Sequence, residues 1–198
     1  MSPDEAVQAA CGLIESARAA RPRVTVAIDG GAGAGKSTLA HGIRDRLGAV
    51  SILRADHFFR PLNEDRSTRL APEEAYLLYF PWQRMRDEAL LPLRRGETAR
   101  YQRHDWETDR LNQWIQLDSK EIILVEGVYS ARPELRPFVD FAIFVDTPRA
   151  ERLRRMVARG HLARDPKNDW LKPWMAAEDW YFSNVRPAEH ARLVVAGI

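Results

Sequence analysis

The chain is poor in cysteine and has no long apolar run. Among 198 residues the one cysteine is Cys11, so no disulfide forms within the chain, and a reducing compartment fits best. No apolar run approaches the ~18 residues of a membrane-spanning helix. Acidic residues stand near the N-terminus, where a secretory signal has basic ones. We therefore expect a cytoplasmic protein with no membrane partner.

The chain also lacks an excess of either charge. Thirty Lys and Arg stand against 28 Asp and Glu, a formal net charge of +2. A general polyanion binder needs a larger positive excess, so we expect no nucleic-acid partner. Basic residues cluster only between Arg149 and Arg164. The length suits one α/β domain with a full core, which we place over residues 1–198.

Short apolar runs alternate with helical patterns along the chain. Strands are expected at 24–29, 49–56, 121–127, 141–146 and 191–197. Helices are expected at 3–20, 36–48, 72–96 with breaks at Pro81 and Pro92, 148–160 and 170–187. Between them lies a polar, aromatic stretch at 100–114. The alternation predicts a parallel sheet covered by helices on both faces.

One glycine-rich stretch, VAIDGGAGAGKSTLA at 26–40, fits the phosphate-binding pattern G-x-x-x-x-G-K-[ST]. Glycines let backbone N–H groups turn toward phosphate oxygens, and the following helix directs its positive N-terminus at the same anion. A lysine at this place neutralises the β and γ phosphates, and the next hydroxyl binds Mg²⁺. The residues expected to bind ATP are Gly30, Gly31, Ala32, Gly33, Ala34, Gly35, Lys36, Ser37 and Thr38.

Two other classes of phosphate-loop protein fit poorly. A GTP switch needs an N-K-x-D guanine reader, and the nearest stretch, PKND at 166–169, has a proline in the asparagine place. An ATP-driven motor has an acidic strand end followed by a glutamate, whereas the strand IILVEG ends in Glu126-Gly127. These differences favour a kinase of small molecules.

Four segments resemble the uridine kinase branch of the P-loop kinases, which includes phosphoribulokinases and nucleoside kinases. They are GGAGAGKST at 30–38, ADHFFRPL at 55–62, ILVEGVY at 123–129 and FVDTPRAERLRRMVARG at 144–160. The tail from Glu178 to Gly197 resembles the last helix and strand of that family. The resemblance implies a P-loop NTPase three-layer sandwich with a mostly parallel central sheet. It also implies a helical substrate insertion at about 58–115, a lid at about 155–170, and ATP and Mg²⁺ as cofactors.

The same resemblance implies roles for the polar residues. Asp56 takes the proton from the acceptor hydroxyl, and Glu126 supports Mg²⁺ or a substrate hydroxyl, so the expected metal set is Ser37, Asp56 and Glu126. Lid arginines stabilise the transferred charge. The expected catalytic set is Asp56, Lys36, Arg155 and Arg159. Simpler roles stay open: a helix N-cap for Asp56, a strand-end cap for Glu126, and a solvated basic face for each arginine.

The acceptor pocket is expected within residues 58–110, where this family inserts its substrate elements. The candidates are Phe59, Arg60, Trp82, Arg84, Tyr101, Arg103 and Asp105, together with Glu126. Aromatic faces with a few polar groups suit a planar or sugar-like ligand. A hydrophobic cluster under the inserted helices explains Trp82 and Trp106 equally well. Pro81 and Ala34 depart from the uridine kinase pattern, so the sequence does not specify uridine.

We therefore predict a phosphotransferase that moves the γ-phosphate of ATP to a hydroxyl of a small molecule: a nucleoside, a sugar or a vitamin-like compound. The alternative is a nucleotide-binding regulatory ATPase with no acceptor, and Asp56 favours the kinase because a switch needs no carboxylate at an acceptor pocket. A nucleic-acid-end kinase needs a continuous basic groove, which a net charge of +2 supports little. The apolar surface of the inserted helices is compatible with a homodimer.

Overall fold

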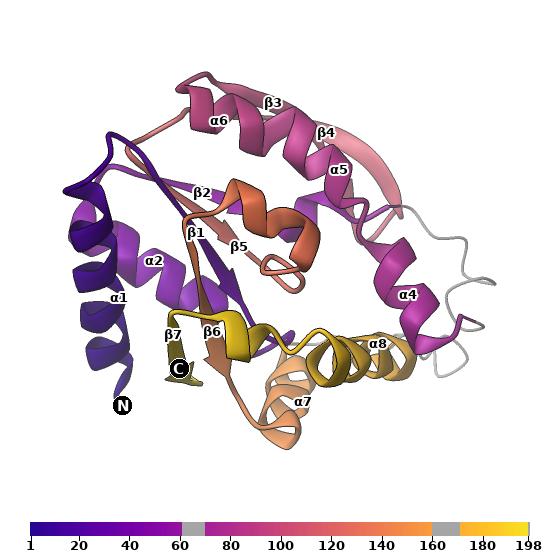
Figure 1. Ribbon diagram of the computed structural model, residues 1–198. Helices are drawn as coiled ribbons and strands as arrows, with labels where there is room; N and C mark the ends of the chain where they lie inside the picture. The colour runs from indigo at the N-terminus through magenta and orange to yellow at the C-terminus, as the bar shows by residue number, and fades with distance from the viewer. Residues whose placement is uncertain (61–69, 160–170, 198) are drawn as a thin grey trace.

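A five-stranded parallel sheet forms the centre of the protein (Figure 1). The computed structural model describes residues 1–60, 70–159 and 171–197. In spatial order the strands are β2 (Val50–Arg54), β5 (Ile122–Glu126), β1 (Val24–Asp29), β6 (Phe141–Asp146) and β7 (Leu193–Ala196). Every pair of neighbours is parallel, as the sequence predicts. The expected fold class is confirmed.

Helices occupy the expected segments between the strands. The α-helices are α1 (Pro3–Arg18), α2 (Lys36–Leu47), α4 (Pro72–Tyr79), α5 (Trp82–Met85), α6 (Leu91–Arg95), α7 (Arg149–Ala158) and α8 (Leu171–Asn184). The shorter turns are η1 (Ala55–Phe58), η2 (Arg86–Leu90), η3 (Pro133–Phe138) and η4 (Pro187–His190). In the described ranges no helix is long and apolar enough to cross a membrane. The expected lid at 155–170 lies outside the described residues from 160 onward.

Side chains of β5 alternate between two cores, one on each face of the sheet. Ile122 and Leu124 pack into a cluster with α1 and α2. Ile123 and Val125 pack on the opposite face into a cluster with α4, α8 and the α5–α6 helix. Figure 1 shows α1 and α2 together on one side and α4 lying along α8. A strand buried on both faces explains the continuous apolar run in its sequence.

The inserted helix runs through Pro92, so the expected break at this proline is wrong. α5, η2 and α6 follow one another from Trp82 to Arg95 without interruption. A proline breaks an α-helix because it lacks an N–H and crowds the carbonyl four residues before it. η2 is a π-helical turn, and its wider hydrogen-bonding pattern directly before Pro92 accommodates the ring. The break at Pro81 is confirmed, because Phe80 is extended there.

The insertion also contains a β-hairpin that the sequence analysis left as a polar, aromatic stretch. β3 (Ala99–Asp105) pairs antiparallel with β4 (Arg110–Leu117). β4 is exposed at most positions, so it has no alternating apolar pattern to reveal it. On the exposed side of the hairpin, the guanidinium of Arg100 in β3 lies 4.7 Å from the centroid of the Trp114 ring in β4. The substrate insertion is therefore a mixture of helices and a hairpin.

The hairpin is attached to η1 through Tyr101. The Tyr101 ring lies 4.5 Å from the Phe58 ring, centroid to centroid, and its hydroxyl lies 3.1 Å from Nδ1 of His57. Burial raises the pKa of Tyr101 to about 12. Burial and the nearby Arg54 and Arg103 charges lower the pKa of His57 from 6.5 to about 4. The fold therefore favours a neutral imidazole at this contact.

The depressed pKa of His57 predicts a loss of stability in acid. The contribution of neutral His57 to the free energy of unfolding is fully present above pH 6.5. It is lost as the pH falls toward 4, because the unfolded chain then binds the proton more tightly than the folded one. We expect wild type to lose about 1 kcal/mol more than His57→Gln between pH 7.5 and pH 5, allowing for partial exposure of the ring. Urea unfolding at both values measures this, and equal losses would contradict it.

Candidate active site

Three glycines give the loop between β1 and α2 its shape. Gly30, Gly33 and Gly35 have φ angles of 144°, 79° and 106°, which side-chain-bearing residues rarely adopt. A Cβ atom added at Gly30 would lie 2.5 Å from the carbonyl oxygen of Val145 in β6. The loop therefore has both the conformation and the close approach that the sequence pattern requires.

The carbonyl groups of this loop are held by the protein around it. The Gly31 carbonyl accepts hydrogen bonds from Nζ of Lys36 at 2.9 Å and from the N–H of Ala34 at 3.1 Å. The Ala34 carbonyl accepts the Thr147 hydroxyl at 2.8 Å. Lys36 is buried, with 7% of its surface exposed. These contacts hold the Gly31 and Ala34 carbonyl groups in place, so the groups of the loop that remain are mainly N–H donors.

Several N–H groups of the loop remain as donors for an anion. Among the described residues, the N–H groups of Gly33, Gly35, Lys36 and Ser37 have no protein acceptor. Such groups at the start of a helix, with the helix dipole behind them, form an anion site. Together with the Lys36 ammonium, they give the loop the chemistry of a phosphate cradle.

Three oxygen-bearing residues meet beside this cradle at the carboxyl edge of the sheet. The Ser37 hydroxyl lies 3.2 Å from each carboxylate oxygen of Glu126, the last residue of β5. Burial and the negative charge of Asp56 in η1 raise the pKa of Glu126. Gly127 permits this arrangement, because a Cβ atom there would lie 2.5 Å from Cβ of Ala55. The structure thus brings Ser37, Asp56 and Glu126 together.

This set of oxygens fits Mg²⁺ bound with a nucleotide. Magnesium is held in such sites by one or two carboxylates, together with phosphate oxygens and water. The described residues contain no cluster of three or more His, Cys, Asp or Glu that would enclose a metal alone. A divalent cation would offset the negative charges of Asp56 and Glu126, since the charge of Asp56 adds to burial in raising the pKa of Glu126.

The two predicted lid arginines lie differently. Nη1 of Arg155 donates to the Gly33 carbonyl at 3.4 Å, and its Nε bonds to Glu151 at 2.7 Å. This side chain therefore lies against the phosphate loop. Arg159 caps the end of α7 and is exposed, and its N–H donates to the Arg155 carbonyl at 3.1 Å. Arg164 lies outside the described residues.

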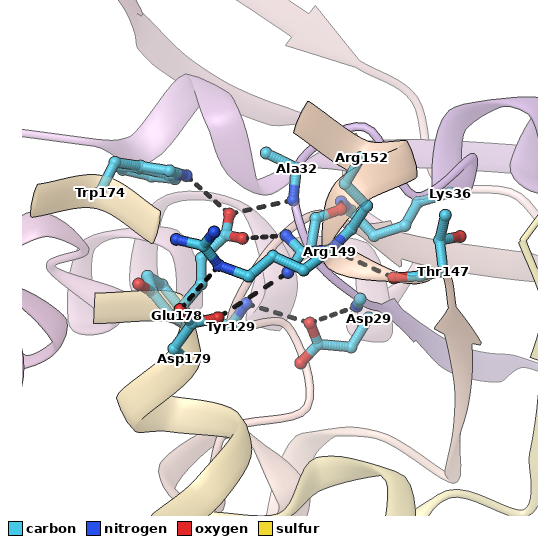
Figure 2. Close-up of polar contacts among 12 residues, drawn as sticks. Asp29, Ala32, Lys36, Tyr129, Thr147, Arg149, Arg152, Trp174, Glu178 and Asp179 are labelled. Carbon is cyan, nitrogen blue, oxygen red and sulfur yellow. Dashed lines mark hydrogen bonds and ion pairs between the residues drawn. The ribbon is translucent and has the colours of Figure 1, made fainter. Parts of the chain in front are cut away.

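The sequence analysis missed Asp29, the last residue of β1. Its buried carboxylate accepts four hydrogen bonds: from the N–H of Gly30 at 2.6 Å, of Tyr129 at 3.2 Å and of Ala131 at 2.8 Å, and from the hydroxyl of Tyr181 at 2.6 Å. Burial raises the pKa of Asp29. Figure 2 shows this carboxylate below the loop. It ties the loop to α8 and to the segment after β5. The available sequence signal for Asp29 was an acidic residue at the end of a mostly apolar strand.

Glu178 was also missed. This buried residue of α8 accepts the N–H of Ala32, in the phosphate loop, at 2.9 Å and the indole N–H of Trp174 at 2.6 Å. It also forms an ion pair with Arg152 of α7, which is 4% exposed (Figure 2). Helical periodicity places Glu178 among buried residues of α8, but nothing in the sequence reveals a partner 146 positions away.

An aromatic cluster lies next to η1. Phe59 lies 5.0 Å from Trp174, 5.1 Å from Trp106 and 5.5 Å from Phe80, measured between ring centroids. Tyr79 stacks on Trp174 at 5.6 Å with an angle of 7° between the rings. Trp106 is 53% exposed, whereas Phe59 is buried. The exposed surface of the cluster is therefore Trp106, which packs on Phe59, and Phe59 lies three residues along the chain from Asp56.

Two predicted acceptor residues support the insertion itself. Arg84 donates to the Gln102 carbonyl and, through Nε, to Glu88 at 3.0 Å, so it ties the inserted helix to the hairpin. Trp82 packs against the core, with the Arg86 guanidinium 5.0 Å from its ring centroid. This contact favours the hydrophobic-cluster interpretation for Trp82.

Three other predicted acceptor residues lie near the hairpin and η1. The Asp105 carboxylate accepts backbone N–H groups at 2.8 and 3.1 Å in the hairpin turn and the Asn112 amide at 2.5 Å. These hydrogen bonds lower the pKa of Asp105. Nε of Arg103 is buried with no hydrogen-bond partner among the described residues. Arg60 is exposed, and its N–H donates to the Tyr79 carbonyl at 3.3 Å.

The fold is similar to those of solved small-molecule kinases. A possible uridine kinase from Bacillus stearothermophilus superposes with a TM-score of 0.72 at 23% identity, covering 96% of this chain and 97% of that one. D-glycerate 3-kinase from Cryptococcus neoformans superposes with a TM-score of 0.59 at 12% identity, covering 87% of each chain. At these identities the likeness concerns the fold alone.

Sequence relatives give the family. Uridine-cytidine kinase B of Dictyostelium discoideum is 32% identical over 139 residues, 68% of this chain and 57% of its own length. Uridine kinase of Halobacterium salinarum is 28% identical over 177 residues, 84% of this chain and 72% of its own length. The family model described as phosphoribulokinase / uridine kinase matches residues 25–187.

These matches favour the predicted kinase over a regulatory ATPase without an acceptor. The match to the family model extends from the first strand to the turn after α8, and so includes the phosphate loop, Asp56 and Glu126. The chain belongs to the phosphoribulokinase/uridine kinase family, whose members use ATP to phosphorylate a hydroxyl group of a small molecule.

Proposed function

We propose that this chain transfers the γ-phosphoryl group of ATP to a hydroxyl of a nucleoside, with Asp56 as the base. The observation that carries the proposal is the meeting of two groups at one sheet edge. One group is the loop with its unpaired N–H donors, and the other is the carboxylate pair of Asp56 and Glu126. Ligands of open parallel sheets bind at this edge.

In this proposal Asp56 accepts the proton of the acceptor hydroxyl. The hydroxyl oxygen forms a bond to the γ-phosphorus while the bond from that phosphorus to the β–γ bridging oxygen breaks, and ADP leaves. Phosphoryl transfer depends on positioning and charge stabilisation more than on a strong base, so an exposed carboxylate suffices. Lys36 and Arg155, which both contact the loop, stabilise the negative charge. Mg²⁺, held by Ser37, Glu126 and Asp56 when bound, neutralises phosphate charge.

A nucleoside is the proposed acceptor because of the aromatic cluster. Trp106 is 53% exposed and offers a face on which a planar base can stack, while the buried rings of Phe59 and Trp174 pack against it. Next to them His104 lies 4.7 Å from Trp106, and its buried Nδ1 has no hydrogen-bond partner among the described residues. A base edge that reached this nitrogen would supply the partner that a buried polar atom normally has. The relatives named above as uridine and uridine-cytidine kinases favour the same class.

Replacing Asp56 tests the base and the acceptor together. At saturating Mg²⁺ we expect Asp56→Asn still to bind ATP but to lose at least about 10²-fold in acceptor-stimulated ADP formation, because no carboxylate takes the proton. The assay screens nucleosides, sugars and vitamin-like compounds with both proteins. Stimulation of wild type by sugars alone would contradict the nucleoside, and equal stimulation of both proteins would contradict the base.

Lys36 tests the phosphate cradle. We expect Lys36→Ala to lower turnover by about 10² or more, since its ammonium is the side-chain cation buried within the loop. Lys120→Ala, at an exposed lysine between β4 and β5, is the matched control and should retain wild-type rates. Unchanged turnover of Lys36→Ala would refute the assignment of this loop.

Glu126 tests the proposed metal site. We expect Glu126→Gln to raise the Mg²⁺ concentration for half-maximal activity about tenfold, because one of two carboxylates is lost. Glu121→Gln, at an exposed residue directly before β5, serves as control. Titrating Mg²⁺ at saturating ATP measures the effect. A reduced maximal rate with an unchanged Mg²⁺ requirement would instead assign Glu126 to the substrate hydroxyl.

A further inference from the structure

A buried ion pair outside the phosphate cradle holds the loop from α7 and α8. Both carboxylate oxygens of Glu178 are engaged: one accepts the N–H groups of Ala32 and Trp174, and the other pairs with Arg152. Glu178 is fully buried, and Arg152 is 4% exposed. Figure 2 shows the carboxylate enclosed by the Trp174 indole, the Ala32 backbone and the Arg152 guanidinium. The transfer step proposed above uses none of these contacts.

Arg152 is packed directly against the glycines of the loop. A Cβ atom at Gly31 would overlap its guanidinium, and one at Gly33 would lie 2.8 Å from its carbonyl oxygen. Nε of Arg152 donates to the Thr147 carbonyl at 3.3 Å, which directs the side chain across the loop. The glycine at position 31 therefore makes room for a buried cation, in a place where a larger residue would separate α7 from the loop.

The direction of one peptide N–H matters here because the loop is short. The N–H of Ala32 turns outward to Glu178, whereas the N–H of Gly33, the next in sequence, has no protein acceptor among the described residues. If the Ala32 N–H lost its partner, that peptide would be held only through the Gly31 carbonyl, and the loop would lose part of its preorganised shape. A bare carboxylate this close to the cradle would repel phosphate, but Arg152 neutralises its charge.

We infer that Glu178 is a positioning residue for ATP. It acts through the Ala32 peptide to keep the free N–H groups of the loop directed at the phosphates, and Arg152 is its counter-ion. The inference rests on the proposed function only in that the loop binds ATP. It is independent of the acceptor and of Asp56.

The test is calorimetric titration of Mg-ATP into the purified protein without an acceptor. In Glu178→Gln the amide cannot present oxygens to both Ala32 and Arg152, so we expect the dissociation constant to rise about tenfold. The stoichiometry should stay at that of wild type, because positioning changes affinity, whereas partial unfolding lowers the number of binding sites. Glu189→Gln is the control, since this carboxylate is 60% exposed and pairs with Arg186 at 3.3 Å, away from Arg152.

A double variant separates positioning from a direct role of Arg152. In Arg152→Met/Glu178→Gln the amide oxygen is free to accept the Ala32 N–H, so we expect affinity to return to within about threefold of wild type. Recovery supports the inference. Wild-type affinity in Glu178→Gln, equal weakening in Glu189→Gln, or a folded double variant that stays weak would each overturn it. If Glu178→Gln alone does not fold, comparison of the double variant with Arg152→Met decides.

Discussion

The active site depends on one constraint: a phosphate loop must keep several backbone N–H groups without a protein acceptor while every other polar group around it is satisfied. An unpaired buried N–H is costly, so the protein fixes the remainder of the loop firmly. Lys36 and Thr147 hold its carbonyls, and Asp29 and Glu178 accept the N–H groups that turn outward. The two buried carboxylates thus hold the Gly30 and Ala32 peptides of the loop, and the remaining N–H groups are left for the nucleotide.

The parallel sheet explains why the chemical groups meet. β1, β5 and β2 are neighbours in register, with Ile28 and Arg54 opposite Glu126 on its two sides. The residues that follow each strand therefore emerge at one edge: the loop after β1, Asp56 after β2 and Gly127 after β5. Strand pairing alone brings together donors, hydroxyl and carboxylates from residues as far apart as Ser37 and Glu126, which are 89 positions apart in the chain. The close approach of Gly127 to Ala55 then sets how near the two carboxylates come.

The donor half of the site was predictable because it is local. The loop, its strand and its helix form one continuous stretch. Glu126 ends a strand and Asp56 stands two residues after one, and both strands are apolar enough to recognise. The insertion was less predictable. Its hairpin strand β4 lies on the surface and lacks an alternating apolar pattern. The helix continues through Pro92 by means of a π-helical turn, which no sequence pattern predicts. Asp29 and Glu178 looked like ordinary acidic residues, because their roles come from partners distant in sequence.

The acceptor half follows a different physical logic from the donor half. Phosphate is recognised by backbone groups and one lysine, so a short pattern carries the information. In the proposed function the acceptor is recognised by aromatic rings from the residue after η1, the hairpin and α8, as in the contacts of Phe59, Trp106 and Trp174. Trp174 also donates to Glu178, so the same helix that lines the aromatic cluster contacts the phosphate loop. α8 thus physically joins the two halves of the site, and its position bears on nucleotide and acceptor alike.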